Sequence, residues 1–292
     1  MKAVWSIGLC MFLLTACLRE HDNMEDCRAD LFFKMQAVPY VFEGREFAGY
    51  RSYYFFVEQL DLFLFDETAI TSSYRYDYAY CRQHPVIPVA SETPPRWYLF
   101  VANLYDPKEL NWTFREGELQ AWFSIVDHEE PPVLLAATSR VEASKDSVSV
   151  GLQMMVSRLE IQLTNPPAWV TGIEVTVRDI AATVSTDFIL GGTTHITKQI
   201  GFDNQGIGDY WFGVNTFPTY RDKTAYLSIG MQGGNEVTPI EIEDQRLHLI
   251  PGVITRLSIE FETDEKMIIS IEIDGKWEII DGGNIIIGMN GY

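Results

Sequence analysis

Basic residues are scarce in this sequence, and long apolar runs are almost absent. Its 292 residues include 22 Lys and Arg against 41 Asp and Glu, which gives a formal net charge of −19 at pH 7. This charge repels nucleic acid and anionic lipid headgroups, so neither is an expected partner. The apolar run of residues 3–14 is shorter than the roughly 20 residues that span a bilayer. The apolar content of 47% nevertheless allows substantial hydrophobic cores.

Motifs of catalysis and cofactor binding are missing as well. None of the five His residues has the two-His spacing of zinc enzymes, and no nucleophile elbow, phosphate-binding loop or dinucleotide fingerprint occurs. Carboxylates are so numerous that choosing one pair as acid and base has no force. The sequence therefore predicts a protein that is not an enzyme and that binds neither a metal ion nor a dissociable cofactor.

The amino-terminal segment has the features of an export signal. Lys2 precedes the apolar run, and Leu14-Thr15-Ala16-Cys17 resembles the lipobox of bacterial lipoproteins. This resemblance predicts that residues 1–16 are a signal peptide and that Cys17 carries a diacylglyceryl group and an N-acyl chain. Two or three acyl chains hold a protein on a membrane far more firmly than one. The alternative is an ordinary secretory signal with a chance cysteine.

Residues 17–29 are polar and acidic, which is typical of a flexible tether. The segment also resembles the acidic signals that follow the lipidated cysteine in surface-exposed lipoproteins of the Bacteroidetes. We therefore expect a lipid-anchored protein of the outer membrane that is exposed at the cell surface. The alternative is a plain solvated linker.

Cysteines are few, and two remain once Cys10 and Cys17 are set aside as part of the signal and the lipid site. Cys27 and Cys81 form an even pair in an oxidising compartment. A disulfide between them would close a loop of about 55 residues, which is worth about 4 kcal/mol in the chain-entropy model. The alternative is two buried free thiols.

The body of the chain reads as all-β. Short runs rich in β-branched and aromatic residues are bounded by Pro, Gly and Asp, and several alternate strictly between apolar and polar residues. Asp274-Gly275 is a tight-hairpin signal, whereas residues 106–120 look helical or irregular. The expected strands are residues 31–35, 53–65, 97–102, 133–137, 148–152, 159–163, 173–177, 226–231, 237–242, 247–250, 253–261 and 267–273.

Many short strands at near-regular spacing favour β-sandwiches, and the length fits two of them. The polar segment 140–147 is the best boundary. We therefore expect an amino-terminal β-sandwich over residues 30–145 and a carboxy-terminal one over residues 146–292.

Two further features have weaker readings. Tyr74, Tyr76, Tyr78 and Tyr80 alternate, which predicts four rings on one face of an extended segment; they would stack on sugars, dock a protein or simply pack. Asp146-Ser147-Val148 matches the short site for O-glycosylation in the Bacteroidetes, which makes Ser147 a glycosylation candidate.

The order of several motifs resembles the FimB/Mfa-type fimbrial anchor lipoproteins of the Bacteroidetes, which are minor subunits of type V pili. The resemblance covers nearly the whole chain after Cys17. It is carried by Asp26-Cys27, an apolar strand from Leu31, VEQLDLFLFD at 57–66, WYLFVANL at 97–104, VSVGL at 148–152 and SRLEI at 157–161.

The resemblance implies two tandem transthyretin-like β-sandwich domains and a place at the base of a fimbria. Pili of this kind join subunits by donor-strand addition, in which one chain completes the sheet of another. A lipid-bearing amino terminus has to stay attached, so the donor is expected at the other end. The candidates are Ile285, Ile286, Ile287 and Met289, with residues 277–280 as a possible addition, and an ordinary closing strand is the alternative.

The expected function is therefore structural, with fimbrial stalk subunits as partners and the outer membrane reached through the lipid. A glycan-binding surface lipoprotein that uses exposed Trp and Tyr is the alternative, and a surface hydrolase is disfavoured. A host or bacterial surface ligand fits either of the first two functions.

Overall fold

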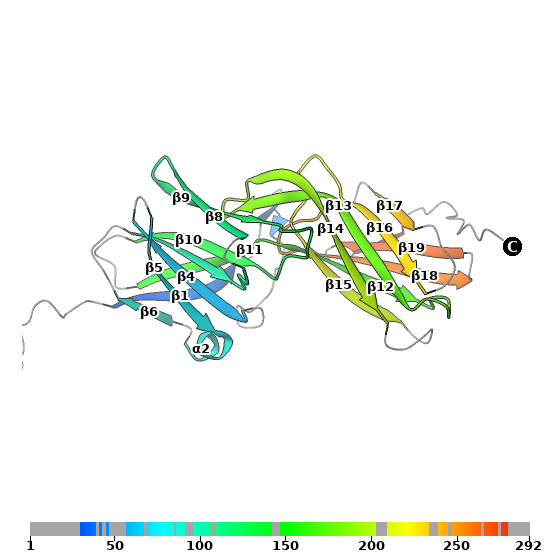
Figure 1. Ribbon diagram of the computed structural model, residues 1–292, viewed down its shortest axis with the longest axis horizontal. Coiled ribbons are helices and arrows are strands. Elements are labelled where there is room, and N and C mark those ends of the chain that lie inside the picture. Colours follow the sequence, from blue (N-terminus) through cyan, green and yellow to red (C-terminus); the bar gives the residue numbers. More distant parts are fainter. Residues whose placement is uncertain are drawn as a thin grey trace, which may run out of the picture.

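The computed structural model describes residues 30–38, 41–42, 45–46, 57–66, 69–84, 86–90, 96–106, 109–141, 147–202, 209–233, 239–244, 247–263, 266–273 and 276–279. The fold is all-β, as the sequence predicts, with one short helix. The strands gather in two groups along the long axis of the molecule, which we call the first and second lobes (Figure 1).

A seven-stranded sheet forms most of the first lobe, in the order β5-β4-β7-β10-β11-β1-β6. Its strands run antiparallel except for β1 and β11, which are parallel. Their bounds are β1 Asp30–Val38, β4 Gln59–Phe65, β5 Ile70–Asp77, β6 Val86–Ala90, β7 Arg96–Ala102, β10 Leu135–Val141 and β11 Ser147–Met154. The short strands β2 (Val41–Phe42) and β3 (Arg45–Glu46) pair with each other.

This sheet curls into a half-barrel. Phe33 of β1 contacts Tyr98 and Phe100 of β7 with ring centroids 4.8 Å apart in both cases, although β10 and β11 separate these strands in the sheet. The helix α2 (Tyr78–Gln83) lies between β5 and β6 in the chain, and these strands are the two edges of the sheet. The contacts across the curl therefore bury large aromatic rings inside the first lobe.

A hairpin of β8 (Leu110–Arg115) and β9 (Glu118–Ser124) covers the outside of the half-barrel, where Trp112 packs 5.1 Å from Phe65. The prediction of a helical or irregular segment over residues 106–120 is therefore wrong. Glu116 and Gly117 have positive φ values of 54° and 84° and form a two-residue turn of the type that fits the twist of paired strands.

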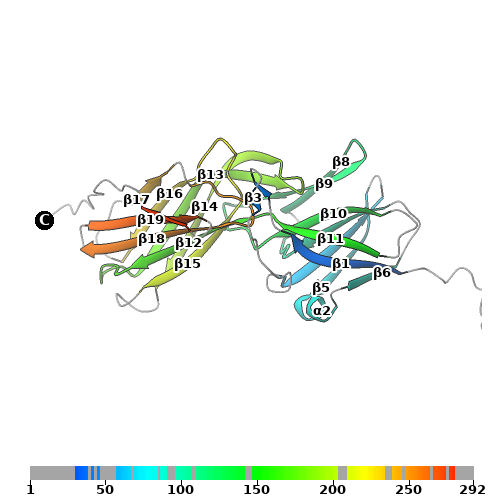
Figure 2. The same cartoon turned by 180° about the vertical axis from the view of Figure 1, so that it is seen from behind.

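The second lobe contains a five-stranded sheet in the order β15-β12-β18-β19-β20 (Figure 2). Its strands are β12 Ser157–Thr164, β15 Tyr210–Thr216, β18 Ile254–Thr263, β19 Lys266–Ile273 and β20 Lys276–Ile279. Ile273 pairs with Lys276, so the hairpin predicted around Asp274-Gly275 is confirmed by the strands on either side of it.

A third sheet spans both lobes, in the order β17-β16-β13-β9-β8 with β14 also paired to β13. Ile173 and Val175 of β13 belong to the core of the second lobe, whereas Ala181 and Val184 of the same strand belong to the core of the first. One strand thus contributes to two hydrophobic cores. The remaining bounds are β13 Gly172–Ser185, β14 Leu190–Gly201, β16 Tyr226–Gln232 and β17 Ile240–Glu243.

Two details differ from the sequence reading. The strand β11 follows the expected boundary at 145/146 but lies in the seven-stranded sheet, and the chain enters the five-stranded sheet only at Ser157. Residues 247–250, which were expected to be a strand, belong to no strand. The backbone groups of Leu247 and Leu249 instead accept single hydrogen bonds from Ala225 and Thr219.

Candidate functional site

The first described strand, β1, is an internal part of the first lobe. β1 pairs with β11 from Phe32 to Val38 on one side and with β6 from Asp30 to Lys34 on the other. Phe33 and Met35 are buried, with 0% and 6% of their surface exposed. Removing β1 would therefore break two ladders of hydrogen bonds and open the half-barrel.

Asn103 fixes the end of the WYLFVANL motif. It follows β7 with a φ of 64°, a left-handed conformation that Asn tolerates better than most residues. Its side-chain oxygen accepts hydrogen bonds from the backbone of Glu58 at 2.7 Å and Gln59 at 3.4 Å, and its amide donates to the carbonyl of Val133 at 2.6 Å. One buried amide thus joins three separate segments of the first lobe.

A network of polar contacts links the segment between β9 and β10 to the second lobe. The carboxylate of Glu130 accepts from the backbone N–H of Asn215 at 2.6 Å and pairs with Lys198 at 2.6 Å. Lys198 also donates to the carbonyl of Gly213 at 2.8 Å, and the Asn215 amide donates to the carbonyl of Pro131 at 3.3 Å. These bonds hold the segment against the edge strand β15.

Two stacked histidines extend this junction. The rings of His128 and His195 lie 4.0 Å apart and nearly parallel, and a ring nitrogen of His128 is 3.1 Å from the carbonyl oxygen of His195. Sequence reasoning did not identify any residue of this network. The run Glu129-Glu130-Pro131-Pro132 is the local signal that could have identified a constrained connection.

The tyrosine pattern is interrupted, and the prediction of four rings on one extended face is wrong. β5 ends at Asp77, whose side chain accepts from the backbone N–H of Tyr80 at 2.8 Å and caps the helix α2. Tyr78 and Tyr80 therefore lie on a helix, whereas Tyr74 and Tyr76 lie on a strand.

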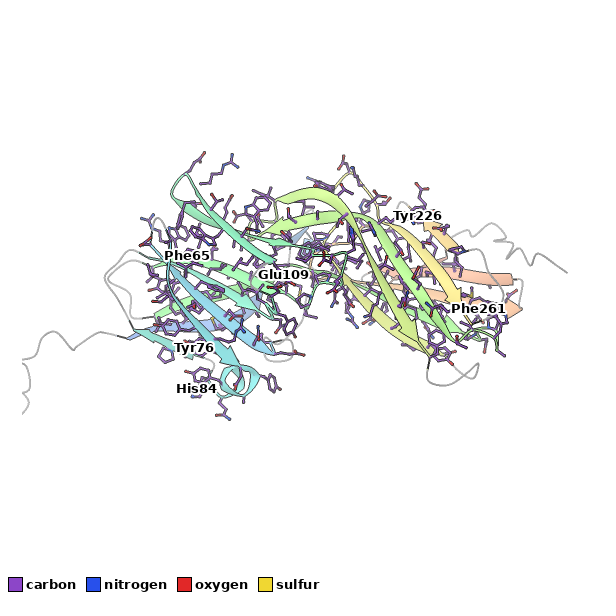
Figure 3. The ribbon with its side chains drawn as sticks, in the orientation of Figure 1. Phe65, Tyr76, His84, Glu109, Tyr226 and Phe261 are labelled. Carbon is purple, nitrogen blue, oxygen red and sulfur yellow. The ribbon has the colours of Figure 1, made fainter. Side chains whose placement is uncertain are left out.

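Three rings stack at this corner: Tyr80 lies 4.9 Å from Tyr76 and 4.1 Å from His84. Figure 3 shows Tyr76 and His84 at this corner of the first lobe. Burial, reinforced by the neighbouring Tyr80, Tyr74 and Cys81, raises the pKa of Tyr76 to about 12. Tyr74 and Tyr78 are 40% and 44% exposed.

Some of the other candidate residues lie in the described part of the chain, and others lie outside it. Cys81 lies on α2 and is 2% exposed, but Cys27 is outside the described residues, so the disulfide stays a prediction. Ser147 is exposed at the start of β11, which is compatible with modification. Residues 276–279 form the edge strand β20, whereas Cys17 and the donor candidates Ile285, Ile286, Ile287 and Met289 are outside the described residues.

Two carboxyl groups of the first lobe have raised pKa values. Burial is the main cause at Asp61, where the ion pair with Arg75 at 2.6 Å opposes the shift. Burial is also the main cause at Glu109, and the nearby charges of Asp106 and Glu129 add to it. Figure 3 shows Glu109 close to where the two lobes meet.

The part of the chain that the structure describes contains no group of three or more His, Cys, Asp or Glu residues that could hold a metal ion. Within the same residues, every helix is too short or too polar to span a bilayer.

The solved structures that resemble this chain include proteins from Bacteroides thetaiotaomicron. A candidate polysaccharide-binding protein from Bacteroides thetaiotaomicron aligns with a TM-score of 0.55 and 10% identity over 88% of this chain and 99% of its own. A candidate adhesin from the same organism aligns with a TM-score of 0.53 and 11% identity over 86% of this chain and 97% of its own. This chain has the fold of those two proteins. No family model and no curated protein matches the sequence.

The structural neighbours also include the fimbrial anchor protein Mfa2 from Porphyromonas gingivalis, at 13% identity and a TM-score of 0.47 over 85% of this chain and 98% of its own. The resemblance noted in the sequence thus has a counterpart among solved structures, at low identity. A likeness of this degree concerns the course of the chain and says nothing of individual residues.

Proposed function

We propose that this protein is a non-enzymatic surface lipoprotein that anchors a fimbria to the outer membrane. In this proposal Cys17 carries the lipid, residues 17–29 form the tether, and two tandem transthyretin-like domains form the body. Fimbrial stalk subunits are the partners, and Ile285, Ile286, Ile287 and Met289 supply the donor strand.

The observation that carries the proposal is the position of β1. This strand begins thirteen residues after Cys17 and is paired on both sides within the first lobe. A tether of that length reaches at most about 45 Å, so the first lobe would stay close to the membrane. Because β1 is held in two ladders, the anchored end is unsuited to exchange with another subunit.

The opposite end of the chain suits donation better. The last described strand, β20, is an edge of the five-stranded sheet and pairs only with β19 among the described strands. The segment that follows contains the continuous apolar run Ile285-Ile286-Ile287 and then Met289, which supplies apolar side chains at the alternate positions that strand addition uses. The fold shared with an adhesin candidate supports a role at the cell surface.

Membrane attachment is tested by Cys17→Ser. We expect the variant to leave the membrane fraction and the cells to shed their fimbriae into the medium. A variant that stays in the outer membrane at the normal level would contradict the anchoring role.

Strand donation is tested by changing side chains on one face of the proposed strand and then on the other, because alternate residues of a strand point to opposite faces. We expect the double variant Ile285→Asp and Ile287→Asp to release fimbriae from cells that keep normal amounts of the anchor. The matched control is Ile286→Asp, whose side chain would face the other way. Equal effects of both changes, or of neither, would contradict an inserted strand.

A further inference from the structure

The outer face of the five-stranded sheet carries an exposed indole. Trp211 of β15 is 56% exposed, the largest exposed fraction among the large hydrophobic side chains that the structure describes. An indole that is more than half exposed gains only part of the stabilisation that burial of its surface would give. Its exposed part is therefore available to a ligand.

The neighbours of Trp211 on this face are small or polar. Trp211 is the register partner of Gln162 on β12, which lies opposite Ser258 on β18, which in turn lies opposite Ser270 on β19. Residues in register share a face of the sheet. The row thus begins at an aromatic ring and continues across an amide and two small hydroxyl side chains. The Gln162 amide donates to the Asp209 carboxylate at 3.4 Å.

A fixed guanidinium group occupies the next row. Gly213 follows Trp211 by two residues, a step of about 6.6 Å along a strand. A Cβ atom on Gly213 would lie 2.2 Å from an Arg158 nitrogen, so the guanidinium lies directly over this glycine. Arg158 is held there by Asn215 at 3.2 Å and by Glu160 at 3.2 Å. The N–H donors of Arg158 are thus close enough to the indole of Trp211 for one sugar residue to contact both.

The charged groups on this face do not favour an anionic ligand. Arg158 and Arg256 both contact Glu160, at 3.2 and 3.0 Å, and Asp209 supplies a second carboxylate. Glu260, two residues beyond Ser258 on the same face of β18, is exposed and adds a third carboxylate. The acidic groups outnumber the basic ones here as they do in the whole protein, which disfavours anionic ligands. An aromatic surface beside fixed donors and acceptors is suited to a ligand with an apolar C–H face and a rim of hydroxyl groups.

We propose that this face of the second lobe, centred on Trp211 with Gln162 and Arg158, binds a neutral glycan. This binding activity goes beyond the anchoring role and does not depend on it. The glycan stacks on the indole and takes hydrogen bonds from the amide and the guanidinium group.

Strand addition by a protein partner is disfavoured at this edge. The backbone carbonyl of Gly213 and the backbone N–H of Asn215 are the groups that an added strand would need. They are already bonded to Lys198 and to Glu130. The contacts that close the edge leave the face around Trp211 open.

The test is affinity electrophoresis of the full chain in gels that contain dextran, α-mannan or laminarin as neutral polysaccharides, with polygalacturonate as the anionic comparison. We expect at least one neutral polysaccharide to retard the protein. Trp211→Ala should weaken this binding roughly tenfold or more, since an aromatic side chain of this size contributes most of the buried apolar surface. Gln162→Ala should weaken it severalfold.

Tyr105→Ala is the control, because Tyr105 is 54% exposed in the other lobe and should leave binding unchanged. Circular dichroism would confirm that each variant is folded. The proposal is overturned if no neutral polysaccharide retards the protein, if only polygalacturonate does, or if Trp211→Ala binds as tightly as the unmodified chain. Loss of a dimer in Trp211→Ala during sedimentation, without loss of glycan binding, would instead show a contact between copies.

Discussion

The two lobes bury different kinds of side chain. The first core contains six buried aromatic residues, Phe33, Phe65, Tyr98, Phe100, Phe123 and Phe217. Among its described buried residues, the second core is built from Ile, Leu and Val together with Ala225 and one aromatic residue, Phe261. Phe33, Tyr98 and Phe100 contact one another across the curled sheet, whereas Phe65 packs against Trp112 of the outer hairpin. The large rings of the first lobe therefore fill both the curl and its contact with the hairpin, whereas the two facing sheets of the second lobe pack with branched aliphatic chains.

The largest effect should come from emptying the half-barrel. Phe100 is fully buried and contacts Phe33 across the curl. Phe100→Ala should lower the free energy of unfolding by about 3–5 kcal/mol, because the rigid ring of strands cannot collapse into the cavity. Urea unfolding measures this loss. Tyr78→Ala, at an exposed helical position, should change stability by less than about 0.5 kcal/mol, and equal losses would contradict a filled half-barrel.

The second-largest effect should come from Asn103, whose side-chain amide links three segments of the first lobe. Asn103→Ala removes the three hydrogen bonds to Glu58, Gln59 and Val133 and should cost about 2–3 kcal/mol. Asn165 also has a positive φ, of 52°, but is exposed. Asn165→Ala therefore isolates the cost of the backbone conformation and should cost about 1 kcal/mol or less. A similar loss in both variants would show that the amide bonds of Asn103 contribute little.

The aliphatic core should tolerate a small deletion. Ile161 of β12 is fully buried in the second lobe. Ile161→Val removes one methylene group and should cost about 0.5–1.5 kcal/mol, measured by the same urea titration. A loss as large as that of Phe100→Ala would remove the contrast between the two cores.

The smallest effect depends on pH. Burial and the charges of Asp106 and Glu129 raise the pKa of Glu109. A carboxyl whose pKa is raised by folding stabilises the protein below its unfolded pKa of about 4.3, and this contribution is lost as the pH rises through the folded value. Glu109→Gln should therefore raise the free energy of unfolding at pH 7, by less than about 1 kcal/mol because solvent screens a partly exposed group. A thermal melt would show this as a higher melting temperature.

The difference between Glu109→Gln and the unmodified protein should vanish below about pH 4, where both side chains are neutral. Glu118→Gln changes an exposed carboxylate of the same hairpin and serves as the control. A stabilisation by Glu109→Gln that is the same at pH 4 and pH 7 would contradict the raised pKa.

Local patterns predicted the strands of the second lobe well. The alternation in residues 159–163 and 173–177 corresponds to β12 and to the first half of β13, because each of these segments has one buried face. The alternation of tyrosines gave a wrong prediction of extended backbone at Tyr78 and Tyr80, because the side chain of Asp77 caps a helix that begins there. Residues 106–120 were misread because Trp112 and Phe114 pack on the half-barrel, a contact invisible to a local window.

The sequence did not predict which distant strands pair with each other. Nothing near Asp30–Val38 indicates that this strand lies parallel to residues 147–153, since parallel partners need no short connection. The contact of Glu130 with Lys198 and the exposure of Trp211 likewise depend on how distant strands meet. The candidate residues that the sequence did identify lie mostly at the ends of the chain.

The parallel pairing of β1 and β11 has a mechanical consequence. A load applied along the axis of β1 from its amino-terminal end shears the ladder between Phe32 and Val38, so that several hydrogen bonds must break together. Unzipping from an end would break them one by one at lower force. Forced unfolding is governed by the rate of crossing this barrier, so β1 resists a load on its amino-terminal end more than a strand that unzips would.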